Sequence, residues 1–355
     1  MVIVHIANID TAILGGVQIA VPQMVRAQSQ YADVGLVNTH GDIIDNVQML
    51  GFNGKLDINQ FPAPFNKPDF VIFHEVYRFE YISIYKELLK HGIPYIVIPH
   101  GCLSKDAQQK KKLKKITANF LFFNDFLKNA RLIQYLSINE KSKSAFQELE
   151  SLVIGNGVPV PTEKKTIFDR SDIRFVYIGR LEIYIKGLDL LFAAVKKSES
   201  LFRRNNAVME IYGPDYNNSH EIIRRMICKL KIEDLVCLKK ETMGAEKRQI
   251  LFSSTCFIQA SRSEGLPLGP LEALSYGLPC IVTQGVGLGD MIESYGAGYQ
   301  SSNSAEGLSA SIDLFFENID KLEDMSQSAV RLIEENFNVD LVAQKTVDRY
   351  CSMLN

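Results

Sequence analysis

The stretch SEGLPLGPLEAL, residues 263–274, decides the fold that this sequence predicts. It follows an apolar run at residues 256–260, which is typical of a buried strand. Pro270 suits the first turn of a helix, because the first amides of a helix have no partner within it. Those free N–H groups make a helix start a natural site for an anion. We therefore predict a strand, a loop and a helix, with Glu264 in the loop and Glu272 in the first helical turn.

Short apolar runs alternate with helical patterns on both sides of this stretch, as in a parallel sheet with crossover helices. The strands expected in the first half are residues 2–7, 34–38, 70–74, 95–98 and 132–137. Those expected in the second half are residues 175–178, 208–212, 236–238, 256–260 and 280–283. Between the halves lies GNGVPVP, residues 155–161, whose glycines and prolines indicate a linker.

The sequence thus predicts an α/β protein of two doubly wound domains, residues 1–158 and 159–338. Ligands are expected at the carboxyl ends of their strands. A last helix at residues 339–355 can pack on either domain, and a crossing back to the first is the arrangement we favour.

Composition sets broader limits. With 355 residues, 46% of them hydrophobic and 23% charged, the chain suits a globular protein of two domains. The net charge of -2 gives no general attraction to nucleic acid. Six cysteines without CxxC spacing indicate neither a zinc site nor a disulfide framework, so we expect a cytoplasmic protein. Apolar stretches fall short of the ~20 residues that span a bilayer, which leaves peripheral contact with the inner face of the cell membrane.

The two glutamates carry a resemblance to a known family. Glu264 and Glu272, with seven residues between them in EGLPL…LEAL, resemble the signature of family 4 glycosyltransferases (glycosyl transferases group 1). The resemblance implies the GT-B fold, in which two Rossmann-like domains face each other across a cleft. It also implies a retaining enzyme that moves a sugar from a nucleoside-diphosphate sugar, with UDP the favoured nucleotide, to a hydroxyl acceptor.

The same resemblance assigns roles within the motif. Glu264 would contact the transferred sugar and Glu272 the nucleotide ribose. Four residues would line the sugar and diphosphate: Gly265, Leu266, Pro267 and Leu268. Proline at position 267 replaces the family's more common glycine and removes an amide donor, which bears on the choice of sugar.

Two cations lie upstream at a strand-to-helix junction, Arg180 and Lys186. A lone cation there is usually a solvated charge, but a pair beside a helix start suits a leaving diphosphate. The family carries the same pair, with one residue fewer between them, so the resemblance implies that both neutralise the departing nucleotide. By resemblance, Gly213 and, less specifically, Thr283 line the nucleotide pocket.

The first half offers its own candidates. Gly15 and Gly16 precede a helix, where glycine lets backbone approach a phosphate, and they resemble the family's loop over the donor diphosphate. His100 follows a strand and suits proton handling, and the resemblance implies that it faces the transferred sugar. The alternative for His100 is a capping or core histidine. His74 and Glu75 are weaker candidates for acceptor binding.

No Asp-x-Asp motif occurs in the chain, so we expect no metal and no cofactor beyond the nucleotide sugar. Arg180 and Lys186 would instead stabilise the leaving group. The basic stretch from Lys105 to Lys115 precedes the aromatic run at residues 120–123, which suits an anionic membrane surface and, by resemblance, a lipid-linked or cell-surface glycan acceptor. The alternative is a solvated helix with core phenylalanines.

Two other functions remain open from the sequence. One is a catalytically silent subunit that binds nucleotide sugar or stabilises a partner. The other is a GT-B-type sugar-nucleotide epimerase, which needs no acceptor. An oxidoreductase is disfavoured, because the loop after the first strand lacks the full GxGxxG pattern.

Overall fold

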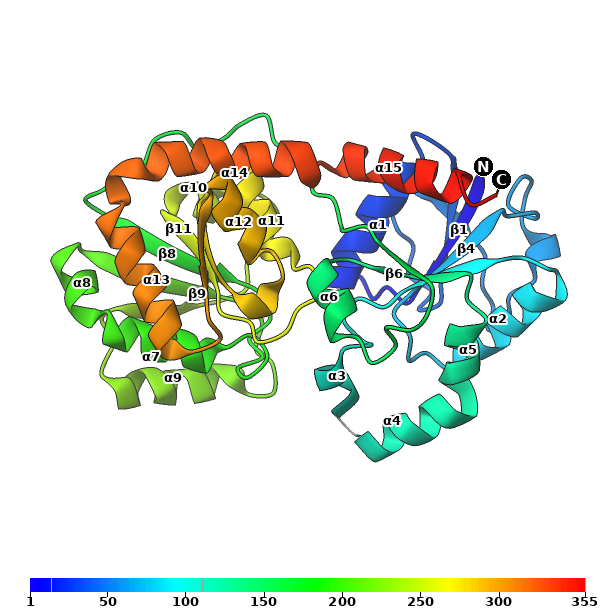
Figure 1. Ribbon diagram of the computed structural model, residues 1–355, viewed down its shortest axis with the longest axis horizontal. Helices are drawn as coiled ribbons and strands as arrows, with labels where there is room; N and C mark the ends of the chain where they lie inside the picture. The colour runs from blue at the N-terminus through cyan, green and yellow to red at the C-terminus, as the bar shows by residue number, and fades with distance from the viewer. Residues whose placement is uncertain (14, 110–111, 355) are drawn as a thin grey trace. The chain divides into compact units, whose positions relative to one another are not determined.

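The computed structural model describes residues 1–13, 15–109 and 112–354. They form two compact units, one of Met1–Gly157 together with Val339–Asn355 and one of Val158–Asn338. In Figure 1 the first unit runs from blue to green and includes the red C-terminal helix, and the second unit runs from green to orange. Within the described residues, no helix has both the length and the apolar character needed to cross a membrane.

The first unit is built on a parallel sheet of seven strands in the order β3-β2-β1-β4-β5-β6-β7. Its strands are β1 (Val2–Ala7), β2 (Asp33–Asn38), β3 (Gln48–Leu50), β4 (Phe70–His74), β5 (Tyr95–Ile98), β6 (Leu132–Tyr135) and β7 (Ser151–Val153). Every residue of β4 and β5 is buried, as expected for central strands covered on both faces.

Helices cover this sheet on both sides (Figure 1). The helices of the first unit are α1 (Gly16–Gln28), α2 (Glu80–Lys90), α3 (Lys105–Gln109), α4 (Lys112–Ala118), α5 (Asn124–Lys128), α6 (Ile138–Lys143) and α15 (Val339–Cys351), with a 3-10 turn η1 (Ile58–Gln60) and a π-helical turn η2 (Asn119–Phe123). Helix α2 buries one stripe, Tyr81, Ile84, Tyr85 and Leu88, at the i, i+3, i+4, i+7 spacing of an amphipathic helix.

The C-terminal helix α15 belongs to the first unit. It packs along α1, where Gln30 Nε2 donates to Asp340 Oδ1 at 2.9 Å. Its buried Tyr350 lies 5.9 Å, ring to ring, from Phe70 of β4 and donates its hydroxyl to Gln134 of β6. The last segment of the chain therefore completes the layer over the first strands.

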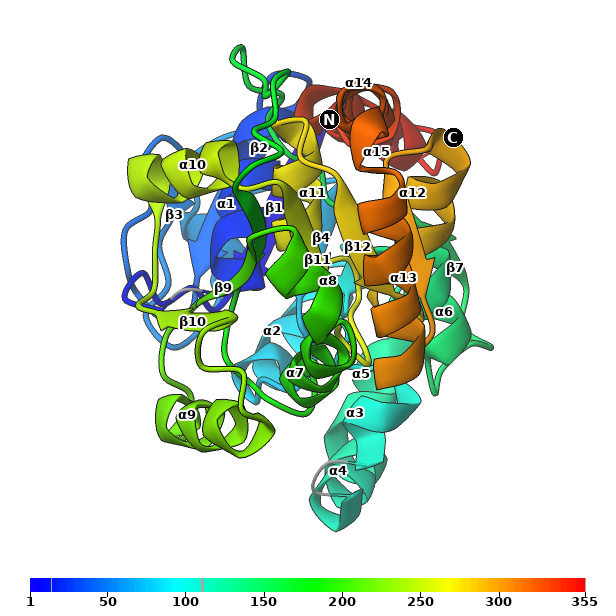
Figure 2. The same cartoon turned by 90° about the vertical axis from the view of Figure 1, so that its left-hand side faces the viewer.

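The second unit, turned toward the viewer in Figure 2, has a parallel sheet of six strands in the order β10-β9-β8-β11-β12-β13. Its strands are β8 (Ile173–Ile178), β9 (Ala207–Tyr212), β10 (Val236–Lys239), β11 (Cys256–Gln259), β12 (Cys280–Thr283) and β13 (Gly298–Ser301). Its helices are α7 (Leu188–Lys197), α8 (Glu199–Arg204), α9 (Ser219–Leu230), α10 (Gly244–Ser253), α11 (Leu268–Ser275), α12 (Gly289–Tyr295), α13 (Ala305–Glu317) and α14 (Leu322–Asn336), with 3-10 turns η3 (Gln284–Val286) and η4 (Ile319–Lys321).

Both sheets follow one winding rule. Counted within its own unit, each sheet begins 3-2-1-4-5-6, the order of a Rossmann-like domain. The winding reverses between β1 and β4 in the first unit and between β8 and β11 in the second. Loops at the carboxyl ends of these strands are where such sheets bind ligands.

All ten strands expected from the sequence are present, with ends that agree within two residues. The strands that the sequence did not predict are β3, β7 and β13, and each lies at an edge of its sheet. Edge strands are short and only partly covered, so they lack the continuous apolar run that marks a central strand.

Candidate functional site

The loop after β11 brings Glu264 against Lys186. Glu264 Oε1 forms an ion pair with Lys186 Nζ, and each side chain is 15% exposed. The same oxygen accepts hydrogen bonds from Ser261 Oγ at 2.9 Å and Gln259 Nε2 at 3.2 Å. The structure thus joins two predicted site residues that are 78 positions apart. The sequence did not single out Ser261 and Gln259, whose hydrogen bonds help to fix the position of the Glu264 carboxylate.

A glycine makes this approach possible. Gly187 precedes α7 in the left-handed conformation, with φ at 63°. A Cβ added there would lie 1.9 Å from the carbonyl oxygen of Ala260, just after β11. Any larger residue would push the start of α7 away from the end of β11, so Gly187 sets the position of Lys186.

Glu272 lies deeper in its helix than the sequence indicated. Helix α11 begins at Leu268 with Pro267 as its N-cap, so Glu272 is the fifth helical residue and the prediction of the first turn is wrong. The cause is Pro270, which occupies the third helical position, where a missing N–H is also harmless. The Glu272 carboxylate pairs with Lys247 of α10, a partner that the sequence did not reveal.

Arg180 is the most exposed of the predicted cations. Its guanidinium donates to Glu182 at 3.1 Å and lies 5.1 Å from the ring centroid of Tyr216. With its side chain 50% exposed, Arg180 is accessible to an anionic ligand. Nearby Arg262, which was also missed, makes a two-pronged pair with Asp189 at 2.7 and 2.6 Å.

The remaining predicted residues of the second unit have different surroundings. A Cβ on Gly213 would lie 2.0 Å from the carbonyl oxygen of Gly179, so the ends of β8 and β9 require glycine at 213. Thr283 is fully buried and donates its hydroxyl to Ser261 O at 2.6 Å, beneath the Glu264 loop. The motif residues Leu266 and Leu268 are buried, whereas Gly265 and Pro267 are partly exposed.

Two residues with strained backbone follow the carboxyl ends of β4 and β5 in the first unit. Glu75, after β4, and His100, after β5, both have positive φ, at 65° and 49°. Non-glycine residues seldom adopt this conformation, and it clusters at functional sites. The next residue, Gly101, donates its amide to buried Glu140 at 2.5 Å, and Glu140 also accepts from Leu136 N at 2.6 Å. Burial raises the pKa of Glu140.

His100 ends a row of three histidines. His100 Nε2 lies 2.9 Å from His74 Nδ1, and His74 Nε2 lies 2.9 Å from His5 Nδ1. At the far end, His5 Nε2 lies 2.9 Å from Gln28 Oε1. Burial lowers the pKa of His5 and of His100 to about 4, and that of His74 well below its usual value. The row is therefore neutral at pH 7.

Burial also decides what these side chains can touch. His74 is fully buried, which excludes the direct acceptor contact proposed for it from the sequence. His100 stays partly exposed at the strand end. The row itself escaped prediction, since His5 sits inside an apolar strand pattern and Gln28 inside a helix.

The glycine pair begins α1 as expected. Gly15 is the N-cap and Gly16 the first helical residue, and the first turn carries no acidic side chain. A Cβ on Gly16 would meet no atom within 4 Å. The fold of the described residues therefore does not itself require glycine at 16.

Comparison with known proteins agrees with this geometry. Residues 161–331, which include Arg180, Lys186, Glu264 and Glu272, match the family model described as glycosyl transferases group 1. Over these residues the chain is similar to the glycosyl transferases of group 1. Two curated relatives are GDP-mannose:cellobiosyl-diphosphopolyprenol alpha-mannosyltransferases. The protein from Xanthomonas oryzae is 25% identical over 65% of this chain and 61% of its own length. That from Xanthomonas campestris is 26% identical over 59% of this chain and 54% of its own length.

Solved structures share the architecture of this chain. Sucrose-phosphate synthase from Thermosynechococcus elongatus matches with a TM-score of 0.76 and 14% identity over 99% of both chains. HepE of Anabaena, in complex with UDP, matches with a TM-score of 0.76 and 15% identity over 99% of this chain and 100% of that one. At such identities the likeness establishes the GT-B fold, with its two Rossmann-like domains.

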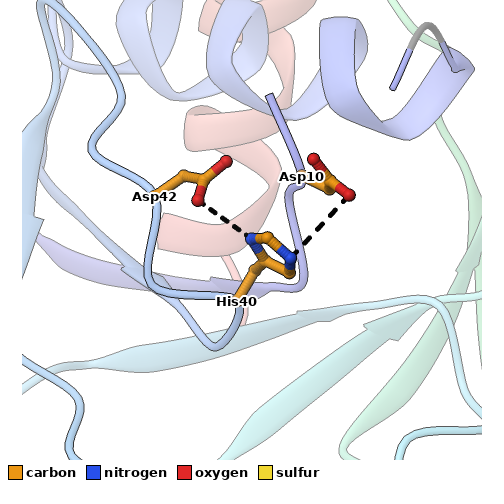
Figure 3. A group of neighbouring side chains, drawn as sticks. All are labelled: Asp10, His40 and Asp42. Carbon is orange, nitrogen blue, oxygen red and sulfur yellow. Dashed lines mark hydrogen bonds and ion pairs between the residues drawn. The ribbon is translucent and has the colours of Figure 1, made fainter. Parts of the chain in front are cut away.

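Among the described residues, Asp10, His40 and Asp42 bring side chains that can ligate a metal close together, at the loops after β1 and β2 (Figure 3). His40 Nδ1 lies 3.0 Å from Asp42, and its Nε2 lies 3.8 Å from Asp10. Asp42 also accepts from the amide and hydroxyl of Thr11 at 2.8 and 2.7 Å, and these bonds lower its pKa to about 2. These contacts brace the two loops against each other.

The basic stretch divides into different environments. Lys110 and Lys111 lie outside the described residues. Lys112 and Lys114 are exposed, whereas Lys115 donates to Ala107 O at 2.6 Å and lies 4.7 Å from the ring centroid of Tyr77. Of the aromatic residues that follow, Phe123 is buried in the core.

Exposed apolar side chains accompany the lysines. Leu113 is 81% and Phe120 80% exposed, and Ile116 and Leu121 are also exposed. Helix α4 stands off from the sheet of the first unit (Figure 1). We name the segment Lys112–Phe122 the α4 surface.

Proposed function

We propose that this chain is a retaining glycosyltransferase that moves a sugar from a nucleoside-diphosphate sugar to a hydroxyl acceptor. The observation that carries the proposal is the pairing of Lys186 with Glu264 at the ends of β8 and β11, where the strand order reverses. A cation for the leaving phosphate and a carboxylate for sugar hydroxyls are thereby held side by side, between the starts of α7 and α11. The match of residues 161–331 to the family model of glycosyl transferases group 1 supports it.

Each donor group has a proposed partner. Glu264 accepts hydrogen bonds from the sugar, and Glu272 accepts them from the ribose. For the nucleotide we favour UDP, the nucleotide in the HepE complex. The names of the two Xanthomonas relatives make GDP-mannose the main competitor. Lys247 must share or release the Glu272 carboxylate when a ribose binds.

The proposed chemistry rests on the two cations. The bond between the anomeric carbon and the diphosphate oxygen breaks, and a bond to the acceptor oxygen forms on the same face. The acceptor's proton passes to the leaving diphosphate, whose charge Lys186 and Arg180 stabilise. Since two cations supply the compensating charge, we propose no metal in this step. From the first unit, we propose that His100 contacts the transferred sugar.

The α4 surface suggests where the acceptor is met. Leu113, Ile116 and Phe120 recur at helical spacing and are exposed next to Lys112 and Lys114. Apolar side chains flanked by lysines suit the interface of an anionic membrane. We propose a lipid-linked glycan acceptor at the inner face of the cell membrane, in cell-surface polysaccharide assembly. Lipid-linked sugar also appears in the names of the two curated relatives.

Donor turnover tests the proposal. The purified chain is incubated with UDP-glucose, UDP-N-acetylglucosamine or GDP-mannose, with and without a polyprenyl-diphosphate-linked disaccharide. We expect nucleoside diphosphate release from one donor, faster with acceptor, and a product that keeps the anomeric configuration. Conversion of donor alone into its epimer would support the epimerase. Binding without turnover of any donor would support the silent subunit.

Vesicle binding tests the α4 surface separately. The chain is sedimented with phosphatidylglycerol vesicles and with phosphatidylcholine vesicles. We expect binding to the anionic vesicles that salt weakens and that Phe120→Glu reduces roughly tenfold. The control is Ile167→Glu in the second unit, since Ile167 is equally exposed at 83%. Equal losses in the two variants would contradict a dedicated membrane surface.

A further inference from the structure

The histidine row has a fixed number of protons. His5, His74 and His100 are neutral at pH 7, so each ring carries one N–H and one bare nitrogen. Three hydrogen bonds of 2.9 Å join Gln28, His5, His74 and His100 in sequence. Each bond needs one proton, so the three ring protons must all point the same way along the row. The direction at one end therefore fixes the tautomer at the other.

Gln28 supplies that direction. Its Oε1, which only accepts, lies against His5 Nε2, so His5 must carry its proton on Nε2. His5 Nδ1 is then bare and accepts from His74 Nε2, and His74 Nδ1 accepts in turn from His100 Nε2. His100 carries its proton on Nε2, which leaves its Nδ1 unprotonated.

The other end of the Gln28 amide faces a small cavity. Gln28 Nε2 is buried without a protein partner in the described part of the chain, and so is Asn156 Oδ1. Both side chains line one cavity between α1 and α15, with about 10 Å³ of room for the centre of a water molecule. That volume suits one water, which can accept from Gln28 Nε2 and donate to Asn156 Oδ1.

We infer that Gln28, acting through His5 and His74, is a positioning residue that fixes the tautomer of His100, so that this ring presents a bare Nδ1 as a hydrogen-bond acceptor. The described residues offer Nδ1 no hydrogen-bond partner, whereas Nε2 is held by His74. A sugar or acceptor hydroxyl can donate to such a nitrogen. The consequence for activity rests on the proposed function, but the tautomer itself does not.

Burial of His5, His74 and Gln28 keeps the direction of the hydrogen bonds in the row fixed. His5, His74 and Gln28 are fully buried, so water does not compete for their nitrogens and amide. In such surroundings a misplaced proton leaves a polar atom unsatisfied, which is costly. The positive φ of His100 is consistent with a ring held in place against backbone strain.

Nitrogen NMR of the full chain labelled with ¹⁵N-histidine tests the inference. The chain has six histidines, and the His100 signals are assigned by their loss in His100→Gln. At pH 7 we expect His100 with bare Nδ1 and protonated Nε2, in roughly tenfold excess over the other tautomer. A protonated Nδ1, or a doubly protonated ring, would overturn the inference.

Variants at Gln28 test the direction of control. Gln28→Met removes the strong acceptor and should turn His100 into a mixture of both tautomers. Gln28→Glu keeps an acceptor oxygen and should keep Nδ1 bare. Gln23→Met is the matched control on the same helix, because Gln23 Nε2 contacts Gly157 O and not the row. An unchanged His100 in Gln28→Met, or a change in Gln23→Met, would contradict control by Gln28.

Kinetics separate positioning from chemistry. With the donor that turns over, and its acceptor, Gln28→Met should lower kcat roughly tenfold with little change in KM, and Gln28→Glu should restore it. If the tautomer changes in Gln28→Met but kcat does not, positioning of the ring is correct and its use in the reaction is not. If no donor turns over at all, the proposed function fails while the NMR result still stands.

Discussion

The two units share one strand order, yet they place opposite chemistry where that order reverses. Around β8 and β11 the side chains are charged and paired, as in Lys186 with Glu264. Around β1 and β4 they are buried and neutral, in the row from Gln28 to His100. The charged set suits an anionic nucleotide and its sugar, whereas the neutral set orients a single acceptor nitrogen. One fold thus supports two kinds of recognition through its loops and strand ends.

The largest expected effect is on the charged side. Lys186→Ala removes the cation proposed to meet the leaving diphosphate, and it leaves Glu264 without its ion pair. We expect kcat for nucleoside diphosphate release to fall by about 10²–10³-fold while the chain stays folded by circular dichroism. Lys196→Ala, at the other end of α7, removes only a surface pair with Glu199 and serves as control. Full activity in Lys186→Ala would refute the role of Lys186.

The stability of the first unit should depend on pH, because its buried histidines become protonated in acid. The folded pKa values of His5 and His100 lie near 4, below the ordinary 6.5, so the unfolded chain binds more protons between these values. The neutral histidines should contribute their full stabilisation to the first unit above pH 6.5. The free energy of unfolding should then fall as the pH drops toward 4, by about 3 kcal/mol per histidine.

Hydrogen exchange in β1 and β4 at pH 7, 5.5 and 4.5 measures this loss. Glu140, whose pKa burial raises, acts in the opposite sense. His5→Gln cannot take up the proton, so it should lose part of the pH dependence while Glu140 keeps its own contribution. The same pH dependence in His5→Gln and the unaltered chain would count against the row.

Glycines at the two helix starts should respond differently. Gly187→Ala meets a positive φ and a carbonyl at 1.9 Å, so we expect the free energy of unfolding to fall by about 2 kcal/mol. Gly16→Ala meets open space and should cost no stability. If the donor diphosphate approaches α1, Gly16→Ala should nevertheless raise KM for the donor. Urea unfolding and donor kinetics on both variants settle the comparison.

The smallest effect concerns the nucleotide. Glu272→Gln removes the charge paired with Lys247 and weakens the proposed acceptor for ribose hydroxyls. We expect roughly tenfold weaker binding of UDP or GDP by calorimetry. Glu306→Gln, at a surface pair with Lys197, is the control and should bind normally. Loss of binding in both variants would indicate a general effect of charge.

The sequence could predict the central strands, and it placed Lys186 and Glu264 in loops that follow strands of the second domain. Continuous apolar runs mark strands buried on both faces, and loops at the carboxyl ends of neighbouring strands must come together. It could not predict the edge strands, which lack such runs. Nor could it predict the histidine row, because contacts between Gln28, His5 and His74 depend on how α1 packs against the sheet. The Lys247–Glu272 pair likewise depends on the packing of α10 beside α11.

Hydrogen–deuterium exchange with added UDP or GDP tests the central claim most directly, namely that the charged loops of the second unit hold the nucleotide. The account predicts slower exchange at residues 261–272 and 180–190 with the nucleotide that binds, and loss of that protection in Glu272→Gln at the same concentration. Protection confined to the first unit, or none at residues 261–272 despite measured binding, would contradict it.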